Sequence, residues 1–279
     1  MTSVLLVTHP GRPDAHELAI DLTEWLSRRG HTTVPVEQLV AGEVRASELG
    51  LVVSLGGDGT MLRAVNLLAG APVPLLGVNM GRLGYLTEVE PPQVYEALER
   101  FERGADVGEW LLDERMMLDV DVTDHSGGRI GTYRALNEAV VEKCESGHTV
   151  NLLASIDSVP FTSYAADGLI VATPTGSTAY SLSARGPIVS PKHRALLLTP
   201  VAPHMLFDRT MVLDPSERID IEVIGDRQAA IAIDGQPSGT LSPGAIVTCT
   251  PSEATARFLR FGGHSYHLVL KAKFGLSDR

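Results

Sequence analysis

The chain has 279 residues, a formal net charge of −11, and 44% hydrophobic against 20% charged residues. This length and composition are those of a globular protein with about two domains, each able to bury a core of its own. The negative net charge argues against a broad surface for nucleic acid or anionic membrane, although it allows a local basic pocket. We therefore expect no nucleic-acid partner.

The cysteines and the N-terminus indicate a reducing compartment. Cys144 and Cys249 are too few for a disulfide framework, and we interpret both as buried small apolar residues. Residues 4–7 form an apolar run that lacks the basic region and the length of a signal peptide, and no stretch is long enough to span a bilayer. The sequence thus predicts a cytoplasmic protein with no membrane partner.

The first part of the chain alternates short apolar strands with helices. Strands are predicted at residues 4–7, 33–36, 51–55 and 73–78, and helices in the segments 14–29, 60–69 and 91–103. Asp14 and Glu17 have the spacing of a capping box at the start of the first helix. Such alternation predicts a parallel sheet with helices on both faces.

From about residue 109 the apolar period changes from that of a helix to that of a strand. Apolar residues alternate with polar ones at Leu118, Val120 and Val122, at Ile219, Ile221 and Val223, and at Ile231 and Ile233. This alternation predicts half-buried antiparallel strands. We therefore expect an α/β domain at residues 1–112, a β-rich domain at 113–264, and a tail at 265–279 that returns to the first domain.

Residues 51–60 lead from a predicted buried strand through a glycine-rich turn, Gly-Gly-Asp-Gly-Thr, into a helix. Glycines and the free N–H groups of a helix start favour a bound phosphate. A carboxylate in such a turn, here Asp58, is unfavourable unless it binds a metal ion or accepts a proton or hydrogen bond from the ligand. The alternative is that Asp58 merely caps the helix, and the turn alone does not decide between the two.

Residues 167–181 combine a short buried strand with a run rich in hydroxyl side chains, interrupted by one Pro and one Gly. Hydroxyls and turn amides at this density are suited to the oxygens of phosphate or ribose. The alternative is a polar loop in which Ser177 or Thr178 caps a helix.

Two further polar motifs interrupt apolar strands. Asn137 and Glu138 are adjacent and suit a ribose diol or a phosphate, although a solvated bulge is the commoner reason for such a pair. Residues 234–236, Asp-Gly-Gln, predict a hairpin turn, with a functional carboxylate as the alternative. In the first domain Arg82 follows a predicted strand, at the edge where α/β sheets usually bind ligands.

Taken together and in this order, the motifs resemble those of the NAD kinase family. The resemblance spans most of the chain and is carried by residues 56–60, 81–87, 137–138, 167–180 and 234–236. It implies an α/β N-terminal domain with a parallel sheet and a mostly antiparallel β-rich C-terminal domain, which is the NAD kinase/diacylglycerol kinase-like architecture. It also implies an active site between the two domains.

The resemblance assigns roles to individual residues. Asp58 would be catalytic, accepting the proton of the adenosine ribose 2′-hydroxyl of NAD as that oxygen attacks the terminal phosphate of ATP. The phosphate-donor loop would comprise Gly56, Gly57, Gly59 and Thr60. The residues that contact NAD would be Gly57, Asp58, Gly59, Arg82, Asn137, Glu138, Asp167, Thr175, Thr178, Ala179, Tyr180, Ala202, Asp234 and Gln236.

The same resemblance implies the other participants in the reaction. NAD and ATP would be the substrates, with inorganic polyphosphate as a possible replacement for ATP. Mg²⁺ or another divalent ion would be held mainly by phosphates, and the chain would form a homodimer or homotetramer. Arg185 stands where the family commonly has Gly, which leaves the choice between NAD and NADH open.

Two other functions compete with this interpretation. Lipid and sphingoid kinases share the Gly-Gly-Asp-Gly-Thr loop, but in them an Asn-Glu pair follows the loop closely, whereas Asn137 and Glu138 come much later in this chain. A dinucleotide sensor without turnover would keep the pocket but would not require Asp58. Both alternatives make predictions that differ from those of an NAD kinase.

Overall fold

The computed structural model describes residues 1–81, 84–262 and 265–276. It divides the chain into two compact units, Met1–Glu114 with Ala256–Arg279, and Arg115–Thr255. The first division lies close to the expected boundary at residue 112. Both divisions fall inside strands, the first in β5 (Leu111–Thr123) and the second in β16 (Ile246–Arg260), so the second does not lie at the expected residue 264.

The first unit is built on a parallel sheet. Its strand order is β2-β1-β3-β4-β16, and each neighbouring pair in this series runs parallel. The strands are β1 (Ser3–Thr8), β2 (Thr32–Val34), β3 (Leu51–Gly56), β4 (Pro74–Asn79) and the end of β16. All six residues of β3 are buried, as expected for a central parallel strand that is covered on both faces.

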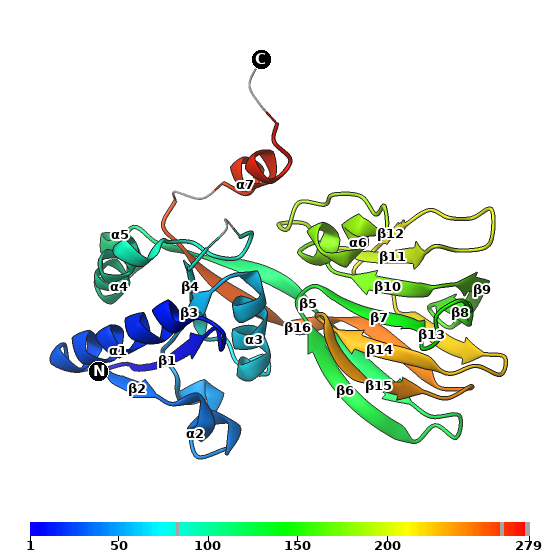
Figure 1. Cartoon of the computed structure of the whole chain (residues 1–279), viewed down its shortest axis with the longest axis horizontal. Helices are drawn as coiled ribbons and strands as arrows, with labels where there is room; N and C mark the ends of the chain where they lie inside the picture. Colours follow the sequence, from blue (N-terminus) through cyan, green and yellow to red (C-terminus); the bar gives the residue numbers. More distant parts are fainter. Residues whose placement is uncertain (82–83, 263–264, 277–279) are drawn as a thin grey trace. The chain divides into compact units, whose positions relative to one another are not determined.

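Helices cover this sheet (Figure 1). The helical segments are α1 (Pro13–Arg28), α2 (Val36–Val40), η1 (Ala46–Glu48), α3 (Asp58–Leu68), η2 (Pro91–Gln93), α4 (Val94–Glu102), α5 (Ala105–Gly108) and α7 (Tyr266–Lys273). Apolar residues of α1 and α4 join one core cluster with Val53, Leu76 and Leu259 from the strands. The expected capping box of α1 is wrong, since no side chain caps that helix and Asp14 instead pairs with Arg12 at 2.6 Å.

The second unit contains two sheets whose facing sides share one apolar core. One sheet has the order β12-β11-β10-β7-β14-β15, and the other contains β16-β13-β8-β9, with β5 pairing β16 and β6. The strands are β5 (Leu111–Thr123), β6 (Arg129–Ala135), β7 (Glu138–Lys143), β8 (Val150–Ile156), β9 (Val159–Ala166), β10 (Gly168–Ala172), β11 (Leu196–Val201), β12 (Met211–Leu213), β13 (Ile219–Ile224), β14 (Ala229–Ile233) and β15 (Gln236–Leu241). Between β10 and β11 lie the short helical segments η3 (Gly176–Thr178) and α6 (Tyr180–Ser183).

The sheets of the second unit confirm the predicted fold class. Neighbouring strands such as β7 and β10, or β13 and β16, run antiparallel. The alternating apolar residues of the sequence are buried in the shared core, for example Leu118, Ile221 and Ile231. One interpretation is wrong: Cys144 is exposed, because it follows the last residue of β7, whereas Cys249 is buried inside β16.

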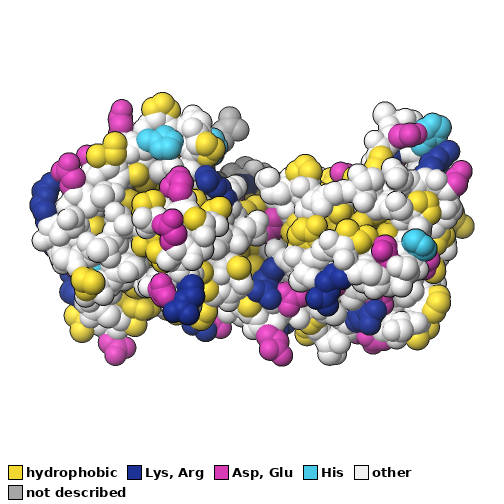
Figure 2. Space-filling model, turned by 90° about the horizontal axis from the view of Figure 1, so that it is seen from below, with side chains coloured by type: hydrophobic (Ala, Val, Ile, Leu, Met, Phe, Trp, Pro, Cys, Tyr) yellow, Lys and Arg dark blue, Asp and Glu magenta, His cyan; other side chains and the backbone are white. Residues whose placement is uncertain are grey.

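One face of the molecule carries mixed charge. On the face drawn in Figure 2, acidic and basic side chains are interspersed rather than gathered into a single-sign field. Among the residues that the structure describes, no helix combines the length and the apolar character that crossing a bilayer requires.

Candidate active site

Asp58 is the first residue of α3, and its carboxylate is held by a different part of the chain. Oδ2 accepts a hydrogen bond from the N–H of Tyr85 and Oδ1 from the N–H of Leu86, both at 2.9 Å. The N-cap residue is Gly57, so the interpretation of Asp58 as a helix cap is wrong. The side chain is half-buried, with its two oxygens oriented by backbone donors.

A glycine makes this contact possible. A Cβ placed on Gly84 would overlap Oδ1 of Asp58, so the backbone of residues 84–86 can approach the carboxylate only because Gly84 has no side chain. The sequence offered Gly84 as part of the motif 81–87 but did not reveal this role. Arg82, from the same motif, lies outside the described residues.

The glycines of the turn before α3 differ in function. A Cβ on Gly56 would overlap the hydroxyl of Thr60, which is buried and has no hydrogen-bond partner among the described residues. A Cβ added to Gly57 or Gly59, in contrast, would meet no atom within 4 Å. Space for a ligand is therefore available at Gly57 and Gly59, next to the free N–H groups of the helix start.

In the second unit Asp234 anchors the segment that carries Asn137 and Glu138. Its carboxylate accepts hydrogen bonds from the N–H groups of Leu136 (2.8 Å), Asn137 (2.7 Å) and Glu138 (3.1 Å). Asp234 and Gly235 both have positive φ, 47° and 74°, as a tight hairpin turn between β14 and β15 requires. The predicted hairpin turn at residues 234–236 is therefore confirmed, and a functional role of the Asp234 carboxylate stays a prediction.

Glu138 is buried beside Asp234 and is only 4% exposed. Burial, reinforced by the charge of Asp234 and opposed by a hydrogen bond from the backbone of Tyr180, raises the pKa of Glu138 to about 8. Burial raises the pKa of Asp234 as well, and the three N–H groups that it accepts oppose this rise because they favour its ionised form. Glu138 accepts none of these three hydrogen bonds and is the protonated member of the pair at neutral pH. The solvated bulge expected as the commoner structure is wrong for Glu138, whose Oε2 is buried without a partner among the described residues.

The hydroxyl-rich segment packs against the same strand break. The N–H of Thr173 donates to the carbonyl of Asn137 at 2.8 Å, and a Cβ on Gly176 would overlap that same carbonyl. The side chain of Asn137 is half-buried. It forms no hydrogen bond with any other described residue, and the hydrogen bond to Asp234 uses the backbone N–H of Asn137. It is thus free to bind a ligand.

The helix-capping alternative for this segment is wrong. Ala179 is the N-cap of α6, and neither Ser177 nor Thr178 caps it. The Ser177 hydroxyl instead contacts the carbonyl of Pro174 at 2.7 Å and accepts the N–H of Val189 at 3.0 Å, which holds the loop closed. Thr175 and Ser177 are buried, whereas Thr178 and Ala179 are half-buried.

Asp167 and Tyr180 form a second group in this unit. The Asp167 carboxylate accepts a hydrogen bond from the ammonium of Lys143 at 2.6 Å. Burial and then the negative charges of Glu142 and Asp167 raise the pKa of the Tyr180 phenol. Sequence reasoning missed Lys143 and Glu142, because the pairing of β7 with β10 that brings them to Asp167 has no signal in the sequence.

The remaining predicted residues are at the surface. Ala202 follows β11, is exposed and has a φ of 44°, and Gln236 is exposed at the start of β15. Among the residues that the structure describes, no group of three or more His, Cys, Asp or Glu side chains is arranged to hold a metal ion.

Comparison with known proteins accounts for these motifs. The family model described as the ATP-NAD kinase N-terminal domain matches residues 40–106, and that of the ATP-NAD kinase C-terminal domain matches residues 136–261. A relative, the NAD kinase of Heliobacterium modesticaldum, is 38% identical over 283 residues that cover 98% of both chains. This chain belongs to the NAD kinase family. Membership of the NAD kinase family makes it a phosphotransferase that phosphorylates NAD.

Solved structures share the fold of this NAD kinase family member. The yeast NADH kinase complexed with NADH matches with a TM-score of 0.89 and 22% identity, covering all of this chain and 89% of that chain. An NAD kinase from Archaeoglobus fulgidus in complex with ATP matches with a TM-score of 0.71 and 25% identity, covering 98% and 97%. The predicted fold class is therefore confirmed.

Proposed function

We propose that this NAD kinase transfers the terminal phosphate of ATP to the 2′-hydroxyl of the adenosine ribose of NAD, with Asp58 as the proton acceptor. The observation that carries the proposal is the orientation of the Asp58 carboxylate by the N–H groups of Tyr85 and Leu86 at the start of α3. A carboxylate so fixed keeps lone pairs available for a hydroxyl proton, and phosphoryl transfer depends on such alignment more than on covalent chemistry.

The start of α3 supports the phosphate part of the proposal. Gly57 and Gly59 leave open space, and the unpaired N–H groups and the positive end of the helix dipole favour phosphate oxygens. Gly56 and Thr60 would act differently, since Thr60 packs against Gly56 and fixes the shape of the turn. These four residues together would form the phosphate-donor loop.

The second unit would bind the dinucleotide. Asn137, with its carboxamide free, and the protonated Glu138 offer donors to hydroxyl or diphosphate oxygens, while Asp234 would act mainly by holding their backbone. Asp167, Thr178, Ala179 and Tyr180 would form the adenosine pocket, in which Asp167 is already oriented by Lys143. Thr175, Ala202 and Gln236 would contribute at its margins.

Mg²⁺ or another divalent ion is part of the proposed reaction and would neutralise charge on the phosphates when bound. Because the described residues include no cluster of three or more ligating side chains, phosphate oxygens would supply most of its ligands. We further propose a cytoplasmic homodimer or homotetramer. The exposed ring pair of Phe161 and Phe207, 5.6 Å apart, supports an interface between copies.

The Asp58→Asn variant tests the proton-acceptor role. We expect NAD affinity, measured by calorimetry, to stay within a few-fold, and NADP formation from Mg²⁺, ATP and NAD to fall at least ~10²-fold, the scale of one proton-transfer group. The melting temperature of the variant serves as the control for folding. An unchanged rate would refute the role.

The same assay separates the competing functions. NADP formation by the unaltered protein with ATP excludes a sensor without turnover, and replacement of NAD by a diacylglycerol tests the lipid-kinase alternative. Replacement of ATP by inorganic polyphosphate determines the phosphate donor. Light scattering coupled to gel filtration measures the oligomeric state.

A further inference from the structure

Three neighbouring strands of the first unit end at the same edge of the parallel sheet, and each leads to one part of a connected group of residues. Asp58 comes just after β3, residues 84–88 follow β4, and Arg260 is the last residue of β16. The strands lie side by side in the order β3-β4-β16 and run parallel, so their carboxyl ends meet. Because α/β sheets usually bind ligands at this edge, Arg260 is placed where it can influence the site around Asp58.

The guanidinium of Arg260 binds the backbone segment that holds the Asp58 carboxylate. Its Nη1 atom donates to the carbonyls of Leu86 and Thr87 at 3.2 and 3.3 Å. The N–H of the same Leu86 donates to Oδ1 of Asp58 at 2.9 Å, and that of Tyr85 donates to Oδ2. Leu86 therefore connects Arg260 to Asp58 through one hydrogen bond at its carbonyl and another at its N–H.

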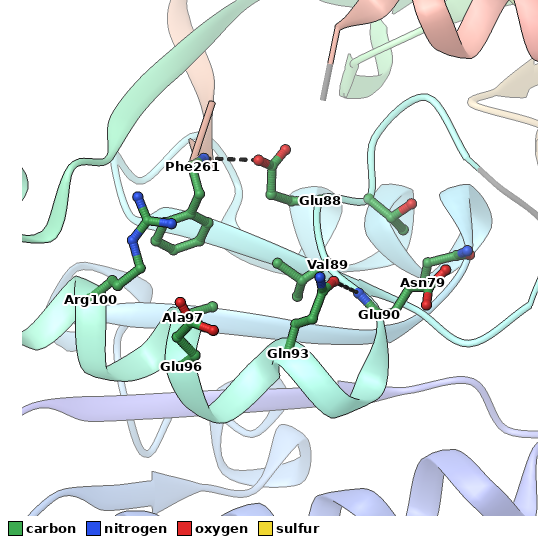
Figure 3. Close-up of a pocket in the computed structure, with 10 residues that line it drawn as sticks. Asn79, Glu88, Val89, Glu90, Gln93, Glu96, Ala97, Arg100 and Phe261 are labelled. Atoms are coloured by element: carbon green, nitrogen blue, oxygen red, sulfur yellow. Dashed lines mark hydrogen bonds between the residues drawn. The ribbon is translucent and has the colours of Figure 1, made fainter. Parts of the chain in front are cut away.

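Two carboxylates fix the position of the Arg260 guanidinium. Oε2 of Glu88 accepts a hydrogen bond from Nη1 of Arg260 at 3.0 Å. Oε1 of Glu88 accepts the N–H of Phe261 at 2.8 Å, the bond drawn between these two residues in Figure 3. Nε of Arg260 donates to Asp113 at 3.3 Å. The guanidinium thus cannot turn away from residues 86–88 without breaking an ion pair.

Burial strengthens these contacts. The side chains of Arg260 and Glu88 are only 11% and 2% exposed. Hydrogen bonds to charged groups are short and strong, and at this burial water competes little for them. A guanidinium is costly to bury unless all of its surroundings supply acceptors, and here two carboxylates and two carbonyls do so. Residues 86–88 are therefore firmly held on the side that faces away from Asp58.

We propose that Arg260 is a positioning residue for Asp58. It fixes the backbone of residues 86–88, so that the N–H groups of Tyr85 and Leu86 keep the Asp58 carboxylate in the orientation that proton acceptance requires. Arg260 acts only through this segment and does not contact the reacting atoms. The inference rests on the proposed function of Asp58, and it adds a residue that lies outside every motif of the sequence analysis.

Steady-state kinetics of NADP formation by Arg260→Met test the proposal. Met retains an apolar stem but donates no hydrogen bond, so residues 86–88 lose their fixed position. A displacement of about 1 Å can reduce turnover ~10²-fold, and we expect kcat to fall at least ~10-fold. The KM values for NAD and ATP should change less than ~3-fold, because the hydrogen bonds of Arg260 in the described part of the chain reach only residues 86–88 and Asp113. An unchanged kcat would overturn the proposal.

Two further variants show whether the lost hydrogen bonds cause the effect. Arg260→Lys restores the charge and three donors, and its kcat should exceed that of Arg260→Met at least ~3-fold. Arg257→Met is the matched control, because Arg257 lies on the same strand but contacts Glu114 and the carbonyl of Pro72 instead. Its kcat should stay within ~2-fold of that of the unaltered protein, and an equal loss in both Met variants would contradict the proposal.

A double variant separates positioning from stability. Arg260→Met leaves the buried Glu88 without its cation, which lowers the melting temperature. Combining Arg260→Met with Glu88→Gln removes both charges, so the melting temperature should rise above that of Arg260→Met alone. The kcat of the double variant should nevertheless remain low, because no guanidinium holds the carbonyls of Leu86 and Thr87. Recovery of kcat together with the melting temperature would make the role of Arg260 structural only and would overturn the proposal.

A double-mutant cycle with Asp58→Asn tests whether Arg260 acts through Asp58. If it does, the two effects are not additive, and Arg260→Met should lower the residual rate of Asp58→Asn by less than ~2-fold. A loss of ~10-fold in both backgrounds would refute the positioning of Asp58 by Arg260 and leave the proposed function of Asp58 intact. An Asp58→Asn variant with an unchanged rate would instead refute that proposed function, and with it the basis of this inference.

Discussion

Asp58 and Asp234 use their carboxylates in the same way, each accepting hydrogen bonds from backbone N–H groups of a distant segment. Asp58 binds the N–H groups of residues 85 and 86, and Asp234 those of residues 136 to 138. A hydrogen bond to a charged group contributes about 1.5–3 kcal/mol, enough to fix the position of both partners. For Asp58, these hydrogen bonds orient a carboxylate that we propose to be catalytic. For Asp234, they hold in place the backbone of residues 136–138, which carries Asn137 and Glu138.

Gly84→Ala is expected to displace the Asp58 carboxylate. The added Cβ would overlap Oδ1 of Asp58, so either the carboxylate or residues 84–86 must move. A displacement of about 1 Å can reduce turnover ~10²-fold, and we expect a loss of at least ~10-fold in kcat for NADP formation. Gly11→Ala is the matched control, because its Cβ would meet only His9 at ordinary contact distance. Equal rates for the two variants would contradict this positioning.

Glu138→Gln is expected to change how stability depends on pH. The pKa of Glu138 is about 8 in the folded chain, against an ordinary value of 4.5. Between pH 4.5 and pH 8 the folded protein keeps a proton on Glu138 that the unfolded chain releases. The contribution of Glu138 to the free energy of unfolding is therefore fully present below pH 4.5 and is lost as the pH rises towards 8. The free energy of unfolding of the unaltered protein falls by at most about 1.4 kcal/mol per pH unit in this range. Because Gln does not titrate, the Glu138→Gln variant does not show this fall.

Urea unfolding of both proteins at pH 5 and pH 7 measures this effect. We expect the stability of Glu138→Gln relative to the unaltered protein to increase by about 2–3 kcal/mol between these two pH values. A constant difference would show that Glu138 is ionised at neutral pH in the folded protein.

At the scale of elements, α6 ends in a Schellman motif whose key position holds Arg185 instead of Gly. The N–H of Gly186 donates to the carbonyl of Ser181 at 2.8 Å, and that of Arg185 to Leu182 at 3.0 Å. Arg185 has a φ of 67°, a conformation in which a side chain costs about 1–2 kcal/mol. A Gly at this position would adopt the same φ without that cost.

We expect Arg185→Gly to stabilise the protein by about 0.5–1 kcal/mol, because the relief of backbone strain exceeds the greater entropy of Gly in the unfolded chain. Arg185→Ala is the control, since it removes the cation but retains a Cβ at positive φ. Urea unfolding compares the two, and the relative rates with NAD and NADH show whether the guanidinium affects substrate choice. Equal stability of Gly and Ala would contradict the strain.

The elements of this fold could largely be predicted from periodicity, because apolar alternation and the strand-helix pattern are local. The spacing of Leu118 and Ile221, for example, predicts that both are buried, and both lie in the core. The division of β16 between two units was not predictable, since its partners β13 and β4 belong to distant parts of the chain. The capping box at Asp14 failed because Arg12 competes for its carboxylate.

The candidate site was predictable in composition but not in its contacts. Asp58, Asn137 and Glu138 were identifiable because their chemistry conflicts with their apolar surroundings. The roles of Gly84 and Asp234 depend on segments that meet only in the folded chain, and Asp234 is 97 residues from its partner Asn137. The raised pKa of Glu138 likewise follows from its burial, which cannot be read from the Asn-Glu motif in the sequence.

At the scale of the whole molecule, the first unit is assembled from two separate parts of the chain. The end of β16 adds a parallel strand beside β4, with Phe258 paired to Leu75, and Leu259 is fully buried in the core that α1 and α4 cover. Among the described residues, the large core cluster of the second unit is made of residues between Met116 and Cys249. The C-terminal segment is therefore a structural part of the first unit.

A chain truncated after Thr255 is expected to lose the first unit while keeping the second. It lacks Phe258 and Leu259, and burial of one large apolar side chain contributes about 1.5–3 kcal/mol, so the loss of both is a large part of a domain's stability. It also leaves Glu88 buried without Arg260. Hydrogen exchange should show amides of β1, β3 and β4 losing protection while those of β7, β10 and β11 remain protected. A chain truncated after Gly262, which keeps all of β16, is the control and should retain amide protection in both units. Loss of amide protection in both units of the shorter chain would contradict the prediction, because it would mean that the second unit does not fold without the first.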